Sequence, residues 1–218
     1  MNHIKKIAAQ LLEHDLDAML ITSKSGERYA LGFHGEGLLL VTRDGAQYST
    51  DGRYIEAARE QLPGLDICLT TTKQGHMAFA KEYVEAKGLK HVGFESGAMT
   101  VDAHLRYSKE LPCTLVPAQK LLDGLRASKD EGELSLMRRA QQITDEAFKA
   151  ILNYIRPGMT EREIAARLVY ELLSRGGERV SFDPIVAAGP NGSRPHAVPG
   201  DRTVEKGMFI TMDFGWKV

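Results

Sequence analysis

Two residues near the C-terminal end of the sequence carry side chains suited to chemistry. The first, Asp213, interrupts the otherwise apolar, strand-like run GMFITMDFGWKV at 207–218. An ionised carboxylate buried in such a strand costs several kcal/mol unless a cation or hydrogen-bond donors compensate it, so a metal ion is one natural partner. The alternative is an aspartate at the end of a strand that pairs with an arginine or caps a turn before Gly215.

The second residue, His196, lies in a loop rich in Gly, Pro, Asn and Ser between two short apolar runs that are typical of strands. Binding and catalytic residues are often found on such loops. A lone histidine is nevertheless more often a surface residue or a satisfied core residue. His196 therefore becomes a candidate only in combination with other features.

Common enzyme signatures other than these are absent from the sequence. Asp213-Phe214-Gly215 matches the metal-binding triplet of protein kinases, but no glycine-rich loop, strand lysine or HRD-type catalytic loop precedes it. The sequence also has no GxxxxGK[ST] loop, GxSxG elbow or HExxH helix. The absence of these motifs argues against a kinase, a P-loop nucleotide hydrolase, a serine hydrolase and a zincin-type protease.

The first part of the chain predicts an α/β unit. Apolar residues at helical spacing predict a helix over 4–12, and a second helix is expected between the fourth and fifth of six strands, which are predicted at 18–22, 37–42, 46–50, 66–70, 91–95 and 113–117. Asp44-Gly45 favours a hairpin between the second and third strands. Asp51 is predicted to cap a helix that follows it.

The second part of the chain opens with two helical patterns. Ser128 and Glu131 fit a capping box at the start of a helix to about 155, and Thr160 and Glu163 fit another at the start of a helix to about 174. The change of pattern near 126 predicts two domains, 1–125 and 126–218. Trp216, the only tryptophan, fits either a core position or an exposed end.

The composition of the chain argues against some classes of binding partner and indicates the cellular compartment. Lys and Arg number 28 against 29 Asp and Glu, so no net basic field attracts nucleic acid or anionic lipid. No apolar stretch has the length of a membrane span, and the N-terminus lacks a signal-peptide pattern. The two cysteines, Cys68 and Cys113, lack CxxC spacing, and core thiols are expected rather than a disulfide or a zinc site. We expect a cytoplasmic protein without nucleic-acid or membrane partners.

Six segments, in order, resemble the M24 metallopeptidase family, in particular its Xaa-Pro aminopeptidase and prolidase branch, which includes creatinase. The segments are SGERYALGF (25–33), TDGRY (50–54), LRASKDEGEL (125–134), RPGMTEREIA (156–165), and SFDPIVAAGPNGSRPHAVPGDR (181–202) with ITMDFG (210–215). The resemblance implies a creatinase-like N-terminal α/β domain followed by the first half of a pita-bread α+β domain. It also implies hydrolysis of the bond between an N-terminal residue and proline, in a homodimer.

The resemblance assigns roles to three residues. Asp213 matches the first aspartate ligand of a site for two divalent ions, for which manganese, cobalt or zinc suits carboxylate ligands. His196 matches the loop histidine that lies beside the metals and binds the substrate or transition state. Phe182 is expected to line the substrate pocket, although a core aromatic is an equally good interpretation.

The sequence also departs from the family pattern. A second aspartate, a histidine and two glutamates complete the family's metal site, and the chain reaches Val218 before any of them. We therefore expect this chain by itself to bind divalent metal weakly and not to hydrolyse peptides, and its half-domain to expose a sheet edge. Two alternatives remain open: a non-catalytic binding or oligomerisation module, and a creatinase-like amidinohydrolase without metal, against which Asp213 argues mildly.

Overall fold

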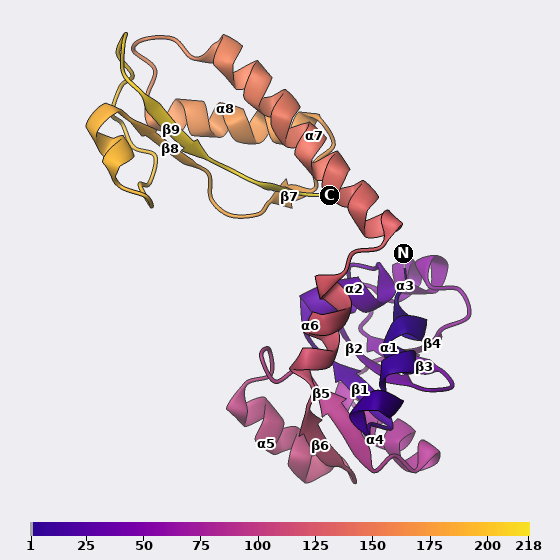
Figure 1. Cartoon of the computed structure of the whole chain (residues 1–218). Coiled ribbons are helices and arrows are strands. Elements are labelled where there is room, and N and C mark those ends of the chain that lie inside the picture. The colour runs from indigo at the N-terminus through magenta and orange to yellow at the C-terminus, as the bar shows by residue number, and fades with distance from the viewer. Residues whose placement is uncertain (1) are drawn as a thin grey trace. The chain divides into compact units, whose positions relative to one another are not determined.

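The computed structural model describes residues 2–218, which form two compact units that divide between Lys129 and Asp130 (Figure 1). The sequence placed the division between 125 and 126, inside helix α6 (Gln119–Ala127). Leu121 and Leu122 of this helix are buried in the core of the first unit, which explains why the helix stays with that unit. Each unit has its own apolar core.

The first unit is built around one mixed six-stranded sheet with the order β4-β3-β2-β1-β5-β6. The strands β1 to β3 pair antiparallel, whereas β1 with β5, β3 with β4 and β5 with β6 pair parallel. All six lie where the sequence predicts strands: β1 (Ala18–Ile21), β2 (Gly37–Thr42), β3 (Ala46–Thr50), β4 (Asp66–Leu69), β5 (His91–Phe94) and β6 (Thr114–Pro117). The predicted hairpin is confirmed, since Val41 pairs with Ala46 across the Asp44-Gly45 turn.

Helices cover both faces of this sheet (Figure 1). Alternate residues of β1 point to opposite faces, so Met19 and Ile21 join one core cluster and Ala18 and Leu20 join the other. The first cluster includes α1 (Ile4–Gln10), α2 (Lys24–Leu31), α3 (Ile55–Gln61) and α6; the second includes α4 (His76–Lys87) and α5 (Val101–Glu110). A short 3-10 helix, η1 (Leu12–His14), follows α1. Helices α2, α5 and α6 were not predicted from the sequence.

The predicted capping role of Asp51 is wrong. Helix α3 begins at Ile55, and its N-cap residue, Tyr54, makes no side-chain cap. The Asp51 carboxylate instead accepts a hydrogen bond from the Arg53 backbone N–H at 2.8 Å and pairs with the Arg53 guanidinium at 2.7 Å. Asp51 therefore stabilises the turn that precedes the helix.

The second unit packs two helices against short strands. Helix α7 (Glu131–Tyr154) and helix α8 (Glu161–Ser174) bury apolar residues against β8 (Ile185–Ala188), β9 (Ile210–Asp213) and β10 (Trp216–Lys217). β8 pairs antiparallel with β9, and β10 with β7 (Arg179–Val180). Within residues 2–218, these two-stranded sheets have no further strand partners, as expected for a half-domain with exposed sheet edges.

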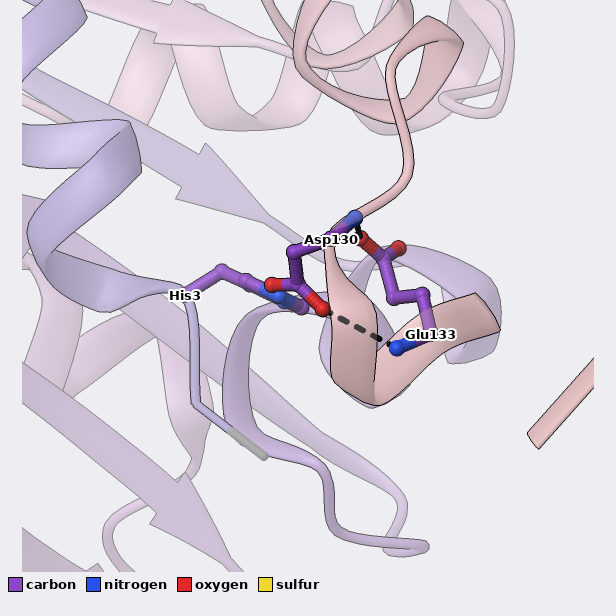
Figure 2. A group of neighbouring side chains, drawn as sticks. All are labelled: His3, Asp130 and Glu133. Atoms are coloured by element: carbon purple, nitrogen blue, oxygen red, sulfur yellow. Dashed lines mark hydrogen bonds between the residues drawn. The ribbon is translucent and has the colours of Figure 1, made fainter. Parts of the chain in front are cut away.

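The capping boxes of the second unit required one correction (Figure 2). The box at Thr160 and Glu163 is confirmed. For α7, the cap is Asp130 rather than Ser128: the Glu133 N–H donates to Asp130 at 2.9 Å, and the Asp130 N–H donates to the Glu133 carboxylate at 3.0 Å. Ser128 is unavailable as a cap because it ends helix α6.

Among residues 2–218, no helix combines the length and the apolar character that a membrane crossing requires. Cys68 and Cys113 are free thiols, but both are half-buried, so the expectation of core thiols is met only in part.

Candidate active-site face of the second unit

Asp213 is the last residue of β9 and lies opposite Ile185 of β8. Alternation along β9 turns Ile210 and Met212 toward the core of helices α7 and α8, and turns Thr211 and Asp213 to the opposite face, where both are exposed. Asp213 is therefore exposed rather than buried, and its carboxylate does not need a cation to compensate for burial.

The Asp213 carboxylate is also not occupied by a protein partner. No residue within 2–218 donates a hydrogen bond to it or forms an ion pair with it, so the alternative of an arginine partner is not observed. The next residue, Phe214, packs back toward α7, with its ring stacked on that of Phe148 at 6.2 Å. Asp213 thus presents an acceptor-only carboxylate to the side of the strand pair that the helices do not cover.

The loop that carries His196 connects β8 to β9 and begins with a 3-10 helix, η2 (Gly189–Ser193). The Gly189 N–H donates to the carbonyl of Phe209 at 2.9 Å, which closes the base of the loop. A Cβ at Gly192 would lie 3.0 Å from the Thr211 hydroxyl, so the loop passes close to the same face that carries Thr211 and Asp213. This close approach places the start of the loop, at Gly192, on the face of the strand pair that carries Thr211 and Asp213.

His196 itself is exposed, between Pro195 and the buried Ala197. Its ring forms no hydrogen bond with any described residue of the chain. Phe182 is 44% exposed and does not belong to the apolar core, so the alternative of a core aromatic is not supported. Its ring lies beside Gly215, where a Cβ would be 3.2 Å away, and so flanks the segment just after Asp213.

The sequence reasoning missed the most heavily bonded carboxylate of this region, Glu161. It is only 1% exposed, at the start of α8. It accepts hydrogen bonds from the backbone N–H groups of Ala188 and Gly200 and from the side chain of Asn191, at 2.8–3.0 Å. In the sequence, Glu161 lies between Thr160 and Glu163, the two residues of the predicted capping box. Its hydrogen bonds reach Ala188 and Gly200, which are distant in sequence, so no local pattern indicates them.

The pKa of Glu161 reflects two opposed effects. Burial raises the pKa of this carboxyl, but the hydrogen bonds from Ala188, Asn191 and Gly200, with the nearby charge of Arg202, outweigh burial and lower it below its ordinary value. Glu161 is therefore ionised in the folded unit at neutral pH.

The first unit has a separate polar cavity of about 360 Å³, lined by Thr22, Lys24, Glu27, Glu36, Gly37, Asp51, Arg53 and His76. Both cations of its lining are paired, because Lys24 pairs with Glu36 at 2.6 Å and Arg53 bridges Glu36 and Asp51. Behind it, the buried Tyr48 hydroxyl donates to Glu27 at 2.7 Å, and burial raises the pKa of both groups.

Comparison with known proteins gives two family matches in succession along the chain. The model of the Creatinase/Prolidase N-terminal domain matches residues 3–128, and that of Metallopeptidase family M24 matches residues 135–218. The uncharacterized peptidase YqhT of Bacillus subtilis is 36% identical over 208 residues, which cover 92% of this chain and 57% of that protein.

Solved structures agree with these matches. The Xaa-Pro dipeptidase from Bacillus anthracis is similar at a TM-score of 0.89 and 31% identity, over 98% of this chain and 60% of its own. The X-Pro aminopeptidase from Thermotoga maritima MSB8 is similar at a TM-score of 0.86 and 29% identity, over 93% of this chain and 59% of its own. This chain thus spans between 57% and 60% of these three proteins. The expected fold class, a creatinase-like α/β domain followed by part of a pita-bread domain, is confirmed.

Proposed function

We propose that this chain, which belongs to metallopeptidase family M24 and carries a creatinase/prolidase N-terminal domain, is part of a metal-dependent exopeptidase. It would form the N-terminal portion of that enzyme. The substrate is a peptide with proline in the second position, and the bond cleaved is the one before that proline. The proposal rests on the exposed face of the strand pair β8 and β9. On this face lies the Asp213 carboxylate, which has no partner among residues 2–218, and the loop that contains His196 begins beside the same face, at Gly192.

The residues of this face suit the proposed chemistry. Asp213 would supply one carboxylate ligand to a divalent metal site, and manganese, cobalt and zinc are the ions proposed for it. When bound, such ions lower the pKa of a water and polarise the scissile carbonyl. The exposed imidazole of His196 can donate to the oxygen on which negative charge develops, and the half-exposed Phe182 ring provides apolar contact for the substrate.

Two further parts of the proposal concern the cell and the assembly. A cytoplasmic location agrees with the free thiols of Cys68 and Cys113, since thiols remain reduced in that compartment. A homodimer is proposed as well, and the exposed apolar side chains of α7 and α8, among them Phe148, Leu152 and Tyr170, offer surface for it.

A fusion protein tests the catalytic proposal. The chain is joined to the portion of the Bacillus anthracis dipeptidase that it does not match, and hydrolysis of an Xaa-Pro dipeptide is measured with added manganese. We expect turnover by the fusion and none by the chain alone. Asp213→Ala should abolish the turnover, and His196→Ala should lower it by roughly 10²–10³-fold if the imidazole stabilises the oxyanion.

Asp201→Ala is the matched control, because Asp201 is exposed and, among residues 2–218, pairs only with Arg162 on the surface, at 3.3 Å. It should leave the turnover of the fusion unchanged. Turnover by the chain alone that Asp213→Ala abolishes would show that the site is complete without the added portion. A fusion whose activity survives Asp213→Ala would overturn the assigned role of this aspartate.

A further inference from the structure

We infer that Glu161 is a positioning residue: its single buried carboxylate holds both ends of the 189–200 loop and thereby sets the position of His196. This inference deepens the proposed function and rests on it, because His196 owes its importance to that proposal. It concerns a residue that touches neither a substrate nor a reacting atom.

The bonds of Glu161 divide between the two ends of the loop. Its Oε1 accepts from the Ala188 N–H at 2.8 Å and from the Asn191 amide at 2.9 Å, where the loop leaves β8. Its Oε2 accepts from the Gly200 N–H at 3.0 Å, where the loop returns, and from the same Asn191 amide at 3.0 Å. One side chain on α8 therefore bridges the departure and the return of the segment that contains His196.

The exposed part of the loop has few other restraints. The Arg194 N–H donates to the Asn191 carbonyl, the Ala197 N–H donates to the Arg194 carbonyl, and the Ser193 hydroxyl donates to the Pro190 carbonyl. All three bonds lie within the loop itself. They shape the loop, whereas its attachment to the rest of the unit comes from the Glu161 bonds, from the Gly189 N–H bond to Phe209, from the Arg162 N–H bond to Gly200 and from the buried Ala197.

A carboxylate suits this position better than an amide. Every group that meets Glu161 is a hydrogen-bond donor, and both oxygens of an ionised carboxylate only accept. A glutamine of the same size would place an NH₂ group against the N–H of either Ala188 or Gly200. It would therefore lose the bonds at one end of the loop without creating a large cavity.

The fold of the unit should survive this change. The Glu161 N–H donates to the Arg202 carbonyl and the Arg162 N–H donates to the Gly200 carbonyl, and a side-chain substitution removes neither bond. Glu163 provides the matched control on the same turn of α8. It is exposed, and within residues 2–218 its carboxylate accepts hydrogen bonds only from Thr160, so it makes no hydrogen bond to the loop.

Hydrogen exchange measured by mass spectrometry on the whole chain tests the inference. In Glu161→Gln, amides of 188–200 should exchange roughly tenfold faster or more, since buried donors lose their acceptor. Amides of α7 between Ile143 and Ile151 should keep their protection. In Glu163→Gln, the 188–200 amides should exchange at the wild-type rate.

The imidazole resonance of His196, assigned by its loss in His196→Gln, reports whether the histidine itself moves. It should shift in Glu161→Gln and stay in place in Glu163→Gln. Unchanged loop exchange in Glu161→Gln, or an equal acceleration in Glu163→Gln, overturns the inference. Accelerated exchange with an unmoved His196 resonance overturns the positioning role.

If Glu161→Gln unfolds the unit, as loss of α7 protection would reveal, Asn191→Ala replaces it. This variant removes only the side-chain donor to Glu161, and it should accelerate exchange within the loop alone. No acceleration in Asn191→Ala would then refute the inference. Neither measurement uses metal or peptide, so a negative result here leaves the peptidase proposal intact, and an inactive fusion leaves the Glu161 result intact.

Discussion

The packing of Trp216 against Gly177 gives a quantitative prediction for the second unit. Trp216 lies on β10, 7% exposed, within the core cluster of α7, α8 and β8. A Cβ built on Gly177 would overlap the indole ring at Nε1, Cδ1 and Cε2. These are ring atoms held in a core rather than the tip of a flexible side chain, so Gly177→Ala must displace either the ring or the backbone at 177.

The expected cost follows from the degree of displacement. Overpacking of a core by a single methyl group typically costs about 1–3 kcal/mol. Complete loss of a large buried aromatic costs about 3–5 kcal/mol, which sets the upper limit. Because at least three atoms of the indole ring lie too close to the added Cβ, we expect Gly177→Ala to lower the free energy of unfolding of this unit by about 3 kcal/mol, near the boundary between the two ranges.

Trp216 is the only tryptophan of the chain, so its fluorescence reports this change directly. In urea titrations, the variant should show a red-shifted native emission and an unfolding midpoint at lower urea. Gly124→Ala serves as the control: apart from its chain neighbours and the backbone of its own helix, no atom of residues 2–218 lies within 4 Å of the added Cβ. Alanine also favours the helix, so the tryptophan transition should not be lowered. A Gly177→Ala protein with wild-type emission and a change below about 0.5 kcal/mol would refute the packing argument.

Three further predictions follow from individual contacts. Tyr48→Phe should lower the free energy of thermal unfolding of the first unit by about 1–3 kcal/mol, because the buried Glu27 carboxyl loses a hydrogen-bond donor. Tyr83→Phe is the control and should change this free energy little, because the Tyr83 hydroxyl forms no hydrogen bond within residues 2–218. The pKa of Glu161 is lowered by folding, so its stabilisation is present above the unfolded value near 4.5 and is lost as pH falls through the folded value. The gap in unfolding free energy between wild type and Glu161→Gln should therefore stay constant from neutral pH to about 5 and shrink below it, and a gap that grows on acidification would contradict this sign. Asp213→Asn should leave the urea midpoint unchanged, since the side chain is exposed and without a protein partner, but should remove the weak manganese-induced NMR broadening expected near residue 213; equal broadening in the variant would exclude Asp213 as a ligand.

The fold was largely predictable because its strands are short apolar runs bounded by turn residues. The hairpin at Asp44-Gly45 and the Thr160 capping box were also readable, since each depends on residues within a few positions of one another. Helix α2 was missed, because Gly26 and the polar residues around it give no clear helical apolar stripe. In the structure, the packing of Tyr29, Ala30 and Leu31 against the sheet supplies the stabilisation that local propensity lacks.

The sequence predicted the candidate site only in part. The wrong predictions, two helix caps and the burial of Asp213, have a common origin. Ser128 and Asp51 both have side chains that can cap a helix. Ser128 is instead the C-cap residue of α6, and the Asp51 carboxylate accepts a hydrogen bond from the Arg53 backbone N–H. The apolar run around Asp213 suggested burial, whereas the pleat of β9 exposes the carboxylate. A local pattern states which residues can adopt a role, and neighbouring elements decide which of them does.

The sequence by itself determined the six strands of the first unit, the two-part organisation and the family, because these depend on local periodicity and on motifs that are contiguous along the chain. Only the tertiary structure decided that Trp216 is a core residue, that Asp213 faces away from the helices, and that Glu161 binds both ends of the His196 loop. Glu161 and Gly200 lie far apart in sequence yet within hydrogen-bonding distance in the fold. Contacts of this kind arise when helix and loop pack together, and no local pattern of residue types encodes them.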